Sequence, residues 1–304
     1  MKRILLIGYS QTGQLYQILD NILAPLQEMT LDQVKIEPKE AYSFPWDAHD
    51  FFDKMPETVL ERPIELQDIE FKYNKYDLII IGYQPWFLSP SPPITSLFEV
   101  AAFVKLLENT PVITVIGARN MWISAQKCLL PKIKKAGGRL IANLPFIDRH
   151  QNLLSALSIL HWMLTGNKTR KWGLLPKPGV SDEDIQQAGQ FGETIAASIQ
   201  KEQWSGLQEA CLKLGRIDIH PSIMLIEKRA KPLFYKWAHL IVKKGSTDKK
   251  RARWISLYKY YLIFALFIIS PIVLLVYTVL FRPILFWKIK ADKQQLLYMG
   301  IGDK

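Results

Sequence analysis

The amino-acid sequence predicts an α/β fold in which helices cover both faces of a parallel, doubly wound sheet of five strands. Three short and largely apolar runs, at residues 4–8, 77–82 and 111–117, each end at a glycine. Runs of this length and composition are typical of strands that are buried on both faces. Helical stretches around residues 94–108 and 120–136 separate the runs, and this alternation favours a parallel sheet.

Two more strands and a final helix complete the expected domain. Residues 140–144 form a fourth clear strand, and residues 33–36 form the weakest of the five. Ser181 begins an amphipathic helix, because serine suits the N-cap position and the acidic residues behind it suit the first turn. We therefore expect the sheet domain to occupy residues 1–205.

The positive charge of the chain is concentrated near its C-terminal end. Residues 1–227 hold 23 lysines and arginines against 25 aspartates and glutamates, whereas residues 228–304 hold 16 against 3. A nucleic-acid-binding protein would carry its excess charge on the folded domain, and here the excess flanks an apolar run. This distribution predicts contact with anionic lipid and no binding of nucleic acid.

The two cysteines and the start of the chain bear on its compartment. Cys128 and Cys211 do not have the spacing of metal ligands, so the sequence predicts no metal site. The chain passes directly from its first three residues into a strand pattern, without the apolar region and cleavage site of a secretory signal. We expect the main domain to lie in the cytoplasm.

An apolar segment near the C-terminus predicts a tether to the inner membrane. Residues 260–281 are 22 consecutive uncharged residues, a helix of about 33 Å against a hydrocarbon core of about 30 Å. Seven basic residues precede the segment within residues 243–259 and four follow it within residues 282–293, which favours a cytoplasmic main domain. Pro271 leaves open a re-entrant hairpin with both ends in the cytoplasm.

The expected domain boundaries follow from these segments. An insertion of about 35 residues, at about 146–180, separates the last strand from the last helix of the sheet domain. The apolar helix of this insertion either packs on the core or lies over the ligand site, as a lid or as an element that dips into the membrane. Beyond the sheet domain we expect a helical basic region at residues 206–257, a membrane segment at 258–287 and a basic tail at 288–304.

The loop after the first strand predicts a phosphate-binding site. Small polar residues and a glycine lie where the strand passes into a helix, and the amides and dipole of a helix N-terminus favour an anion. The glycine-rich patterns of dinucleotide and nucleoside triphosphate sites are absent, which favours a cofactor with one phosphate. The residues expected to hold the phosphate are Ser10, Gln11, Thr12, Gly13 and Gln14.

Two further loops predict the rest of a flavin site. Ligands of doubly wound sheets lie at the carboxyl ends of the strands, where the loops after residues 77–82 and 111–117 emerge. Both loops offer aromatic faces and main-chain donors that suit a planar isoalloxazine ring, so FMN is the expected cofactor. The residues expected to contact the ring are Gln84, Pro85, Trp86, Phe87, Gly117, Ala118 and Asn120.

The phosphate loop resembles that of the flavodoxin superfamily, which has the pattern [ST]-x-T-G-x-T. Ser10, Thr12 and Gly13 match this pattern, and Leu15 replaces the final threonine. Residues 187–192 also resemble the last helix of flavodoxin-like oxidoreductases. The resemblance implies a flavodoxin-like fold that binds FMN.

Nearly the whole chain is similar to the bacterial family of dialkylresorcinol condensing enzymes. The segments that carry this resemblance are residues 9–15, 44–46, 83–86, 88–91, 114–117, 119–123, 176–181 and 260–271. Condensation of acyl thioesters requires a catalytic cysteine, and neither cysteine here lies in such a setting. The resemblance therefore implies a flavin-dependent oxidoreductase for the companion step, oxidation of a dialkyl-1,3-cyclohexanedione to a resorcinol. It also implies a lipophilic dialkyl substrate and a ketosynthase or acyl-carrier protein as partner.

Such a dehydrogenation requires a base, a group that holds the enolate oxygen and a hydride acceptor. His150 follows the last strand and is the expected base. Arg119 or Arg149 is expected to hold the enolate oxygen, with Tyr83 as an alternative donor.

Two other functions fit the same sequence. The chain would serve equally as a membrane-tethered NAD(P)H:quinone reductase or electron carrier of flavodoxin type. It would also serve as a non-catalytic or condensing partner that recruits a ketosynthase at the membrane. The substrate that is oxidised distinguishes the quinone reductase from the dione oxidase, and failure to retain flavin distinguishes the non-catalytic partner from both.

Overall fold

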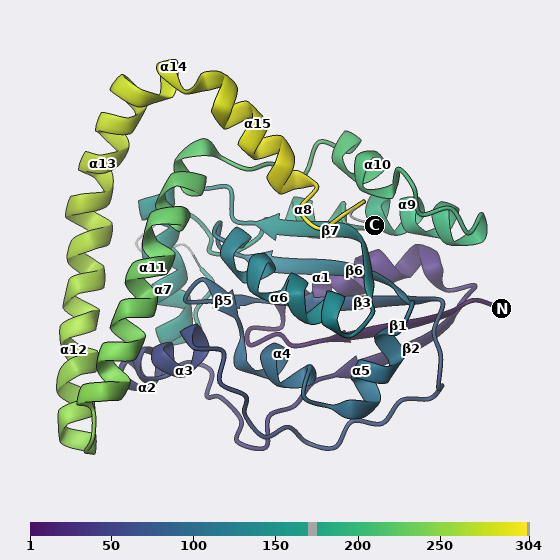
Figure 1. The fold of residues 1–304 in the computed structure, drawn as a ribbon, viewed down its shortest axis with the longest axis horizontal. Coiled ribbons are helices and arrows are strands. Elements are labelled where there is room, and N and C mark those ends of the chain that lie inside the picture. Colours follow the sequence, from purple (N-terminus) through teal and green to yellow (C-terminus); the bar gives the residue numbers. More distant parts are fainter. Residues whose placement is uncertain (170–174, 303–304) are drawn as a thin grey trace.

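The computed structural model describes residues 1–169 and 175–302 and contains a parallel sheet of five strands in the order β2-β1-β3-β6-β7 (Figure 1). The sheet confirms the predicted fold class. Each expected strand is present, with its ends moved by at most three residues. The strands are β1 (Arg3–Gly8), β2 (Thr30–Lys35), β3 (Leu78–Tyr83), β6 (Pro111–Ala118) and β7 (Arg139–Ile147).

The sheet is buried on both faces because successive side chains of each strand point to opposite sides. In β1, Ile4 and Leu6 belong to one apolar core, and Leu5 and Ile7 belong to the other. The first core is covered by α1 (Gln14–Leu23), η1 (Ala24–Leu26), α8 (Asp182–Gln186), α9 (Gly189–Gln200) and α10 (Leu207–Lys213). The second is covered by α4 (Pro92–Leu97), α5 (Ala101–Leu107) and α6 (Ile123–Lys135).

Two of the predicted helices are each divided in the structure. The stretch at 94–108 becomes α4 and α5, because the chain is extended at Val100, whose ψ is 105°. The stretch at 181–200 becomes α8 and α9. Ser181 is the N-cap of α8 as expected, and its Oγ accepts a hydrogen bond of 3.0 Å from the amide of Asp184.

Glycines allow three elements to approach one another at the carboxyl ends of the strands. A Cβ atom on Gly8 would lie 2.5 Å from the carbonyl oxygen of Gly82. A Cβ atom on Gly82 would lie 2.6 Å from the side chain of Leu19, which is part of α1. The glycines that end the apolar runs therefore bring β1, β3 and the start of α1 close together.

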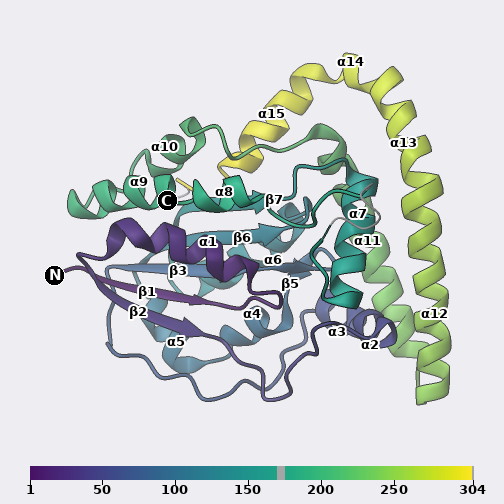
Figure 2. The same cartoon turned by 180° about the vertical axis from the view of Figure 1, so that it is seen from behind.

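Several short elements lie beyond the carboxyl ends of the strands (Figure 2). They are α2 (Ala48–Asp53), α3 (Met55–Val59), the hairpin of β4 (Pro85–Trp86) and β5 (Ser89–Pro90), and α7 (Asn152–Thr165), which is the apolar helix of the insertion. Against them lies the helical hairpin of α11 (Pro221–Lys244) and α12 (Asp248–Phe264).

A single long helix continues from α12 and forms an outer edge of the molecule (Figure 1). It runs from Asp248 to Ile284, and it is long and apolar enough to cross a membrane. Its most apolar window of 18 residues has a mean hydropathy of 2.7 and is only 6% buried. The parts after α12 are η3 (Ala265–Ile269), α13 (Ser270–Val276), η4 (Tyr277–Phe281) and α14 (Arg282–Ile284), and α15 (Phe286–Leu297) follows.

Candidate functional site

The loop between β1 and α1 has the geometry of an anion-binding turn. Gly13 is left-handed, with φ of 75°, and no atom would lie within 4 Å of an added Cβ. The amide of Leu15 donates to Ser10 Oγ at 3.3 Å, and the amide of Gln11 donates to Gln84 Oε1 at 2.8 Å. The amides of Thr12 and Gly13 donate to no group in the described part of the chain. Unpaired amides at a helix N-terminus suit a phosphate.

The two glutamines of this loop hold it to the rest of the protein. Gln11 Oε1 accepts from the hydroxyl of Tyr9, and Gln11 Nε2 donates to the carbonyl of Ser43 at 2.9 Å. The buried side chain of Gln14 both donates to and accepts from the backbone of Val180 at 3.0 Å. These two side chains thus position the loop, whereas the sequence alone predicts that they bind the phosphate.

Leu15, which replaces the last threonine of the flavodoxin pattern, lies in the core. It is 1% exposed, and its Cβ and Cδ1 atoms lie 3.4 Å from the position of a Cβ on Gly117. The side chain thus packs α1 against the end of β6. Ser10 and Thr12 are the hydroxyl residues that remain in the loop.

A cavity of about 220 Å³ opens beside this loop at the carboxyl ends of β1, β3 and β6. Many expected site residues line it: Gln11, Thr12, Gln14, Gln84, Pro85, Trp86, Phe87, Gly117, Ala118 and Arg119. The wall also contains Leu15, Ile18, Phe51, Ile159, Trp162, Met163 and Gly179, which the sequence analysis did not name as site residues. Helix α7 supplies three of these, so the apolar helix of the insertion covers the cavity.

The loop after β3 has a strained and aromatic structure. Phe87 and Leu88 have φ of 47° and 62°, a left-handed conformation that is costly for bulky residues. Lys231 of α11 helps to hold them there, because its Nζ donates to the Leu88 carbonyl at 3.0 Å and to Ser89 Oγ at 2.6 Å. Such outliers are concentrated at ligand sites, where the surrounding structure fixes them.

Aromatic rings pack around Trp86 at the cavity wall. Its ring is edge-on to Tyr42 at 5.0 Å and to Trp46 at 5.5 Å, and Phe87 packs on Phe51 at 5.1 Å. Offset and edge-to-face contacts at these separations are favourable. They fix an apolar, aromatic wall next to the phosphate turn.

Among the described residues that line the cavity, Arg119 is the one cationic side chain. Its Nη1 donates to the carbonyl of Asn152 at 2.9 Å and to Asn152 Oδ1 at 2.7 Å. Burial lowers the pKa of this guanidinium to about 10, and the charge of Asp148 opposes that decrease. Asn120 does not line the cavity; its Nδ2 donates to the same Asn152 Oδ1 at 2.9 Å and so supports Arg119 from behind.

His150 belongs to a hydrogen-bonded group at the end of β7. Its Nδ1 lies 2.6 Å from Oδ1 of the buried Asp148, whose Oδ2 accepts from Ser155 Oγ at 2.7 Å. The amide of Asp148 donates to the carbonyl of Arg119 at 2.7 Å, which links the group to the cavity loop. The His150 side chain is 44% exposed and is not among the residues that line the cavity.

Arg149 and Tyr83 lie away from the cavity. The Nε of Arg149 forms an ion pair with Asp184 at 3.0 Å, and its Nη2 donates to the carbonyl of Arg216 at 2.6 Å. Tyr83 is fully buried in the second core, where its hydroxyl donates to Gln126 at 2.8 Å and burial raises its pKa well above the usual value. The alternation of Ile79, Ile81 and Tyr83 along β3 was the available sequence signal for this placement.

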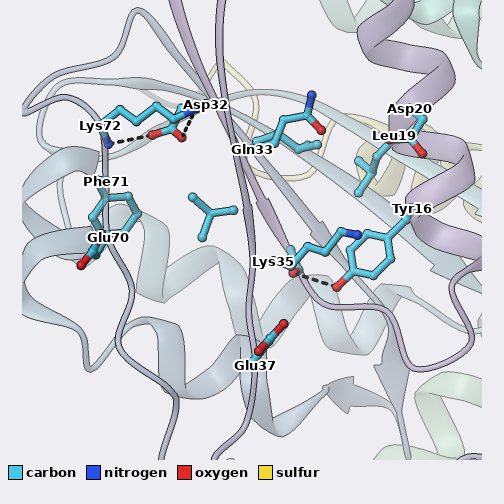
Figure 3. A pocket seen from close by; sticks show the side chains of 13 residues that line it. Tyr16, Leu19, Asp20, Asp32, Gln33, Lys35, Glu37, Glu70, Phe71 and Lys72 are labelled. Atoms are coloured by element: carbon cyan, nitrogen blue, oxygen red, sulfur yellow. Dashed lines mark hydrogen bonds and ion pairs between the residues drawn. The ribbon is translucent and has the colours of Figure 1, made fainter.

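A second cavity, of about 630 Å³, lies along the edge strand β2 (Figure 3). Four of its six charged side chains are acidic, namely Asp20, Asp32, Glu37 and Glu70, against Lys35 and Lys72. Asp32 accepts from the hydroxyl of Tyr76 and from the amide of Lys72 at 3.0 Å, and Lys72 Nζ lies 3.7 Å from Asp32. Lys35 lies 4.9 Å above the ring of Tyr16. The turn at Gly13 does not line this cavity, where an anion would meet more acidic than basic side chains.

The strand order of the sheet and the glycine turn before α1 define a flavodoxin-like fold, with the smaller cavity between the loops after β1 and β3 where the strand order reverses. No family model matches the sequence, and no curated protein matches it. Among solved structures, a flavoprotein from Lactobacillus acidophilus in complex with FMN is 19% identical over 48% of this chain and 93% of its own, with a TM-score of 0.40.

Two other solved structures show similar values. A putative flavoprotein from Bacteroides eggerthii is 16% identical over 50% of this chain and 91% of its own, with a TM-score of 0.39. Oxidised flavodoxin 1 from Bacillus cereus is 14% identical over 66% of this chain and 98% of its own, with a TM-score of 0.34. The fold assignment rests on the strand order, and the site is argued from its own residues.

Proposed function

We propose that this protein is a membrane-associated, FMN-dependent oxidoreductase that oxidises a dialkyl-1,3-cyclohexanedione to the corresponding resorcinol. The observation that supports this most is that the amides of Thr12 and Gly13, at the start of α1 and beside an aromatic cavity, have no partner in the described part of the chain. A phosphate bound to these amides would place an attached planar ring toward Trp86, Phe87 and Ala118. When bound, FMN would accept a hydride from the substrate.

The protein side chains would bind the substrate and move the proton. Loss of two hydrogens from the dione ring releases one proton and one hydride, and the carbonyl groups acidify the C–H bond that loses the proton. Arg119, a cation in a largely apolar wall, would hold the enolate oxygen. His150 does not line the cavity, but Asp148 links it to the cavity loop at Arg119. It would be the final acceptor of the proton, at Nε2, because Asp148 holds its Nδ1 and so fixes the orientation of the ring.

The cysteines argue against condensation by a thiolate. Burial raises the pKa of the Cys128 thiol to about 11 and that of Cys211 to about 12. Both thiols therefore stay protonated at neutral pH, and the thiolate is the nucleophilic form. Oxidation remains the step of a dialkylresorcinol pathway that suits this fold.

Anaerobic titration of the FMN-reconstituted protein with a dialkyl-1,3-cyclohexanedione tests this proposal. We expect bleaching of the visible absorbance of oxidised flavin, together with one resorcinol formed for each flavin reduced. Rapid reduction by NAD(P)H followed by quinone reduction, with no change on adding the dione, would instead favour the reductase. Protein that binds neither FMN nor dione would favour the scaffold.

A further inference from the structure

We propose that the long apolar helix does not cross the membrane but lies within one leaflet as an arch, with both of its ends on the side of the sheet domain. The arch is residues 260–284, between the hairpin of α11 and α12 and the returning helix α15. Its partner is the hydrocarbon and headgroup region of an anionic leaflet. This inference concerns the attachment of the protein and holds whatever reaction the cavity performs.

The first end of the arch is fastened to the domain. Arg251, near the start of α12, donates to both carboxylate oxygens of Glu57 at 3.1 and 2.8 Å and to the carbonyl of Asp53 at 2.8 Å. Ile255 and Tyr258 are 2% and 0% exposed, because they pack with Phe52 and other residues of α2, α3 and α11. The arch therefore leaves the domain from a fixed position.

The second end of the arch is fastened to the domain as well. After Ile284 the chain turns, and α15 returns toward the sheet (Figure 1). Gln208 Nε2, on α10, donates to the carbonyl of Leu297 at 2.8 Å, and Lys293 forms an ion pair with Asp218. A Cβ on Gly300 would lie only 2.5 Å from the side chain of Leu130 on α6, which shows how closely the two segments pack.

These contacts are incompatible with a spanning helix. A helix that crosses the bilayer has its two ends on opposite sides of a hydrocarbon core of about 30 Å. Residues 285–302 would then lie beyond the membrane from the sheet domain and would lose their contacts with Gln208, Asp218 and Leu130. Both ends can keep their contacts only if the helix enters and leaves the membrane on one side.

Between its ends the arch is apolar over most of its surface, and its side chains are exposed or half-buried apart from that of Tyr277. The exposed apolar side chains that lie along it are Ile263, Phe264, Ile268, Ile269, Ile272, Val273, Leu275, Val276, Val279, Leu280, Phe281 and Ile284. An interfacial helix with one polar face would rest on the headgroups, but a helix without a polar face is stable only where lipid surrounds it. The arch is therefore immersed in the leaflet.

Charges and aromatic rings at the two ends match the headgroup region of that leaflet. Tyr260 is 63% exposed at the start of the arch, and Trp287 is 75% exposed beyond its end. Basic residues flank both ends, including Lys259 and Arg282. A spanning helix would carry one of these basic flanks to the far side, whereas a one-sided arch places both against the anionic cytoplasmic leaflet.

Sidedness of the C-terminal helix tests the proposal first. In a chain with Cys128→Ala and Cys211→Ala, we would place one cysteine at Gln294 or, as the matched domain marker, at Glu193; both sites are exposed. Sealed right-side-out and inverted membrane vesicles would be treated with a membrane-impermeant maleimide. We expect both cysteines to react in inverted vesicles and neither in right-side-out vesicles. Reaction of Gln294→Cys only in right-side-out vesicles would overturn the arch.

Depth along the helix is an independent second test. Spin labels at Ile263→Cys, Ile272→Cys and Phe281→Cys would be compared in vesicles of phosphatidylethanolamine and phosphatidylglycerol. An arch predicts that all three labels collide with oxygen more than with an aqueous nickel complex, at similar depths within one leaflet. A maximum depth at the bilayer centre for residue 272 alone, with shallow flanks, would indicate a spanning helix. High exposure to the nickel complex at all three sites would show that lipid does not cover the helix.

Discussion

The two cavities of this protein differ in a way that volume alone does not reveal. The cavity along β2 is the larger, at about 630 Å³ against about 220 Å³, yet four of its six charged side chains are acidic, which disfavours an anionic ligand. The cavity at the strand ends is smaller and contains an unsatisfied anion turn, a cation and a strained aromatic loop. Donors that suit an anion and are held in place by the fold, rather than empty space, mark the functional site.

Substitution of Gly13 is expected to have the largest effect, and it tests the comparison of the two cavities most severely. Valine there adds about 3 kcal/mol of strain at a φ of 75° and displaces the amides of the turn, so we expect FMN affinity to decrease about 100-fold. FMN fluorescence quenching measures this affinity. Gly206→Val is the matched control, because Gly206 has φ of 85°, equally open surroundings and no part in the cavity. Equal losses in the two variants would contradict the assignment.

Exchanging a cation in each cavity is expected to have the next largest effect. Arg119→Gln removes a positive charge that meets the enolate, and we expect kcat/KM for the dione to decrease about 10- to 100-fold, the range for a hydrogen bond to a charged group. Lys72→Gln removes a cation from the cavity along β2 and should leave kcat/KM unchanged. If Lys72→Gln decreased kcat/KM as much as Arg119→Gln does, the assignment of the reaction to the cavity at the strand ends would be contradicted.

The pH dependence of turnover should report the burial of Arg119. Its pKa is lowered to about 10, so the guanidinium is charged below that pH and becomes neutral as the pH rises through it. We expect kcat/KM to decrease as the pH rises through about 10, while circular dichroism confirms that the protein remains folded. The same decrease in Arg119→Gln would assign the titration to another group.

The smallest effect is expected from restoring the missing hydroxyl at position 15. Leu15→Thr should lower the free energy of unfolding by about 2 kcal/mol, because it leaves part of a fully packed site empty. It should also tighten FMN binding by about fivefold through one added hydrogen bond. Leu19→Thr, in the cavity along β2, should cause a similar loss in urea unfolding without any change in FMN affinity.

The fold was predictable because its strands carry a local signal. The glycines that end the apolar runs recur at Gly8, Gly82 and Gly117, and there is no room for a side chain at Gly8, where β1 meets β3, or at Gly82, where β3 meets α1. The phosphate turn was predictable for the same reason, since Gly13 and its neighbours lie between a clear strand and a clear helix. These features depend on residues that are close in sequence.

The parts of the site that escaped prediction depend on distant contacts. Phe51 and Trp162 reach the cavity from α2 and α7, and no local pattern connects either residue with the phosphate turn. Gln14 resembled a phosphate ligand but pairs with Val180, 166 residues away. Arg149 follows β7 and is therefore predicted from the sequence to hold the enolate oxygen, but it forms an ion pair with Asp184. From the sequence alone, Asp184 is only an acidic residue in the first turn of α8.

The flavin content of the full-length protein, purified in mild detergent, tests the central claim most directly. Visible absorbance and flavin released by heat would be measured before and after incubation with FMN and desalting. We predict one FMN per chain after reconstitution, with loss of that flavin in Gly13→Val and retention in Gly206→Val. Colourless protein after reconstitution, or full retention of FMN in Gly13→Val, would contradict a flavin site at the carboxyl ends of β1, β3 and β6.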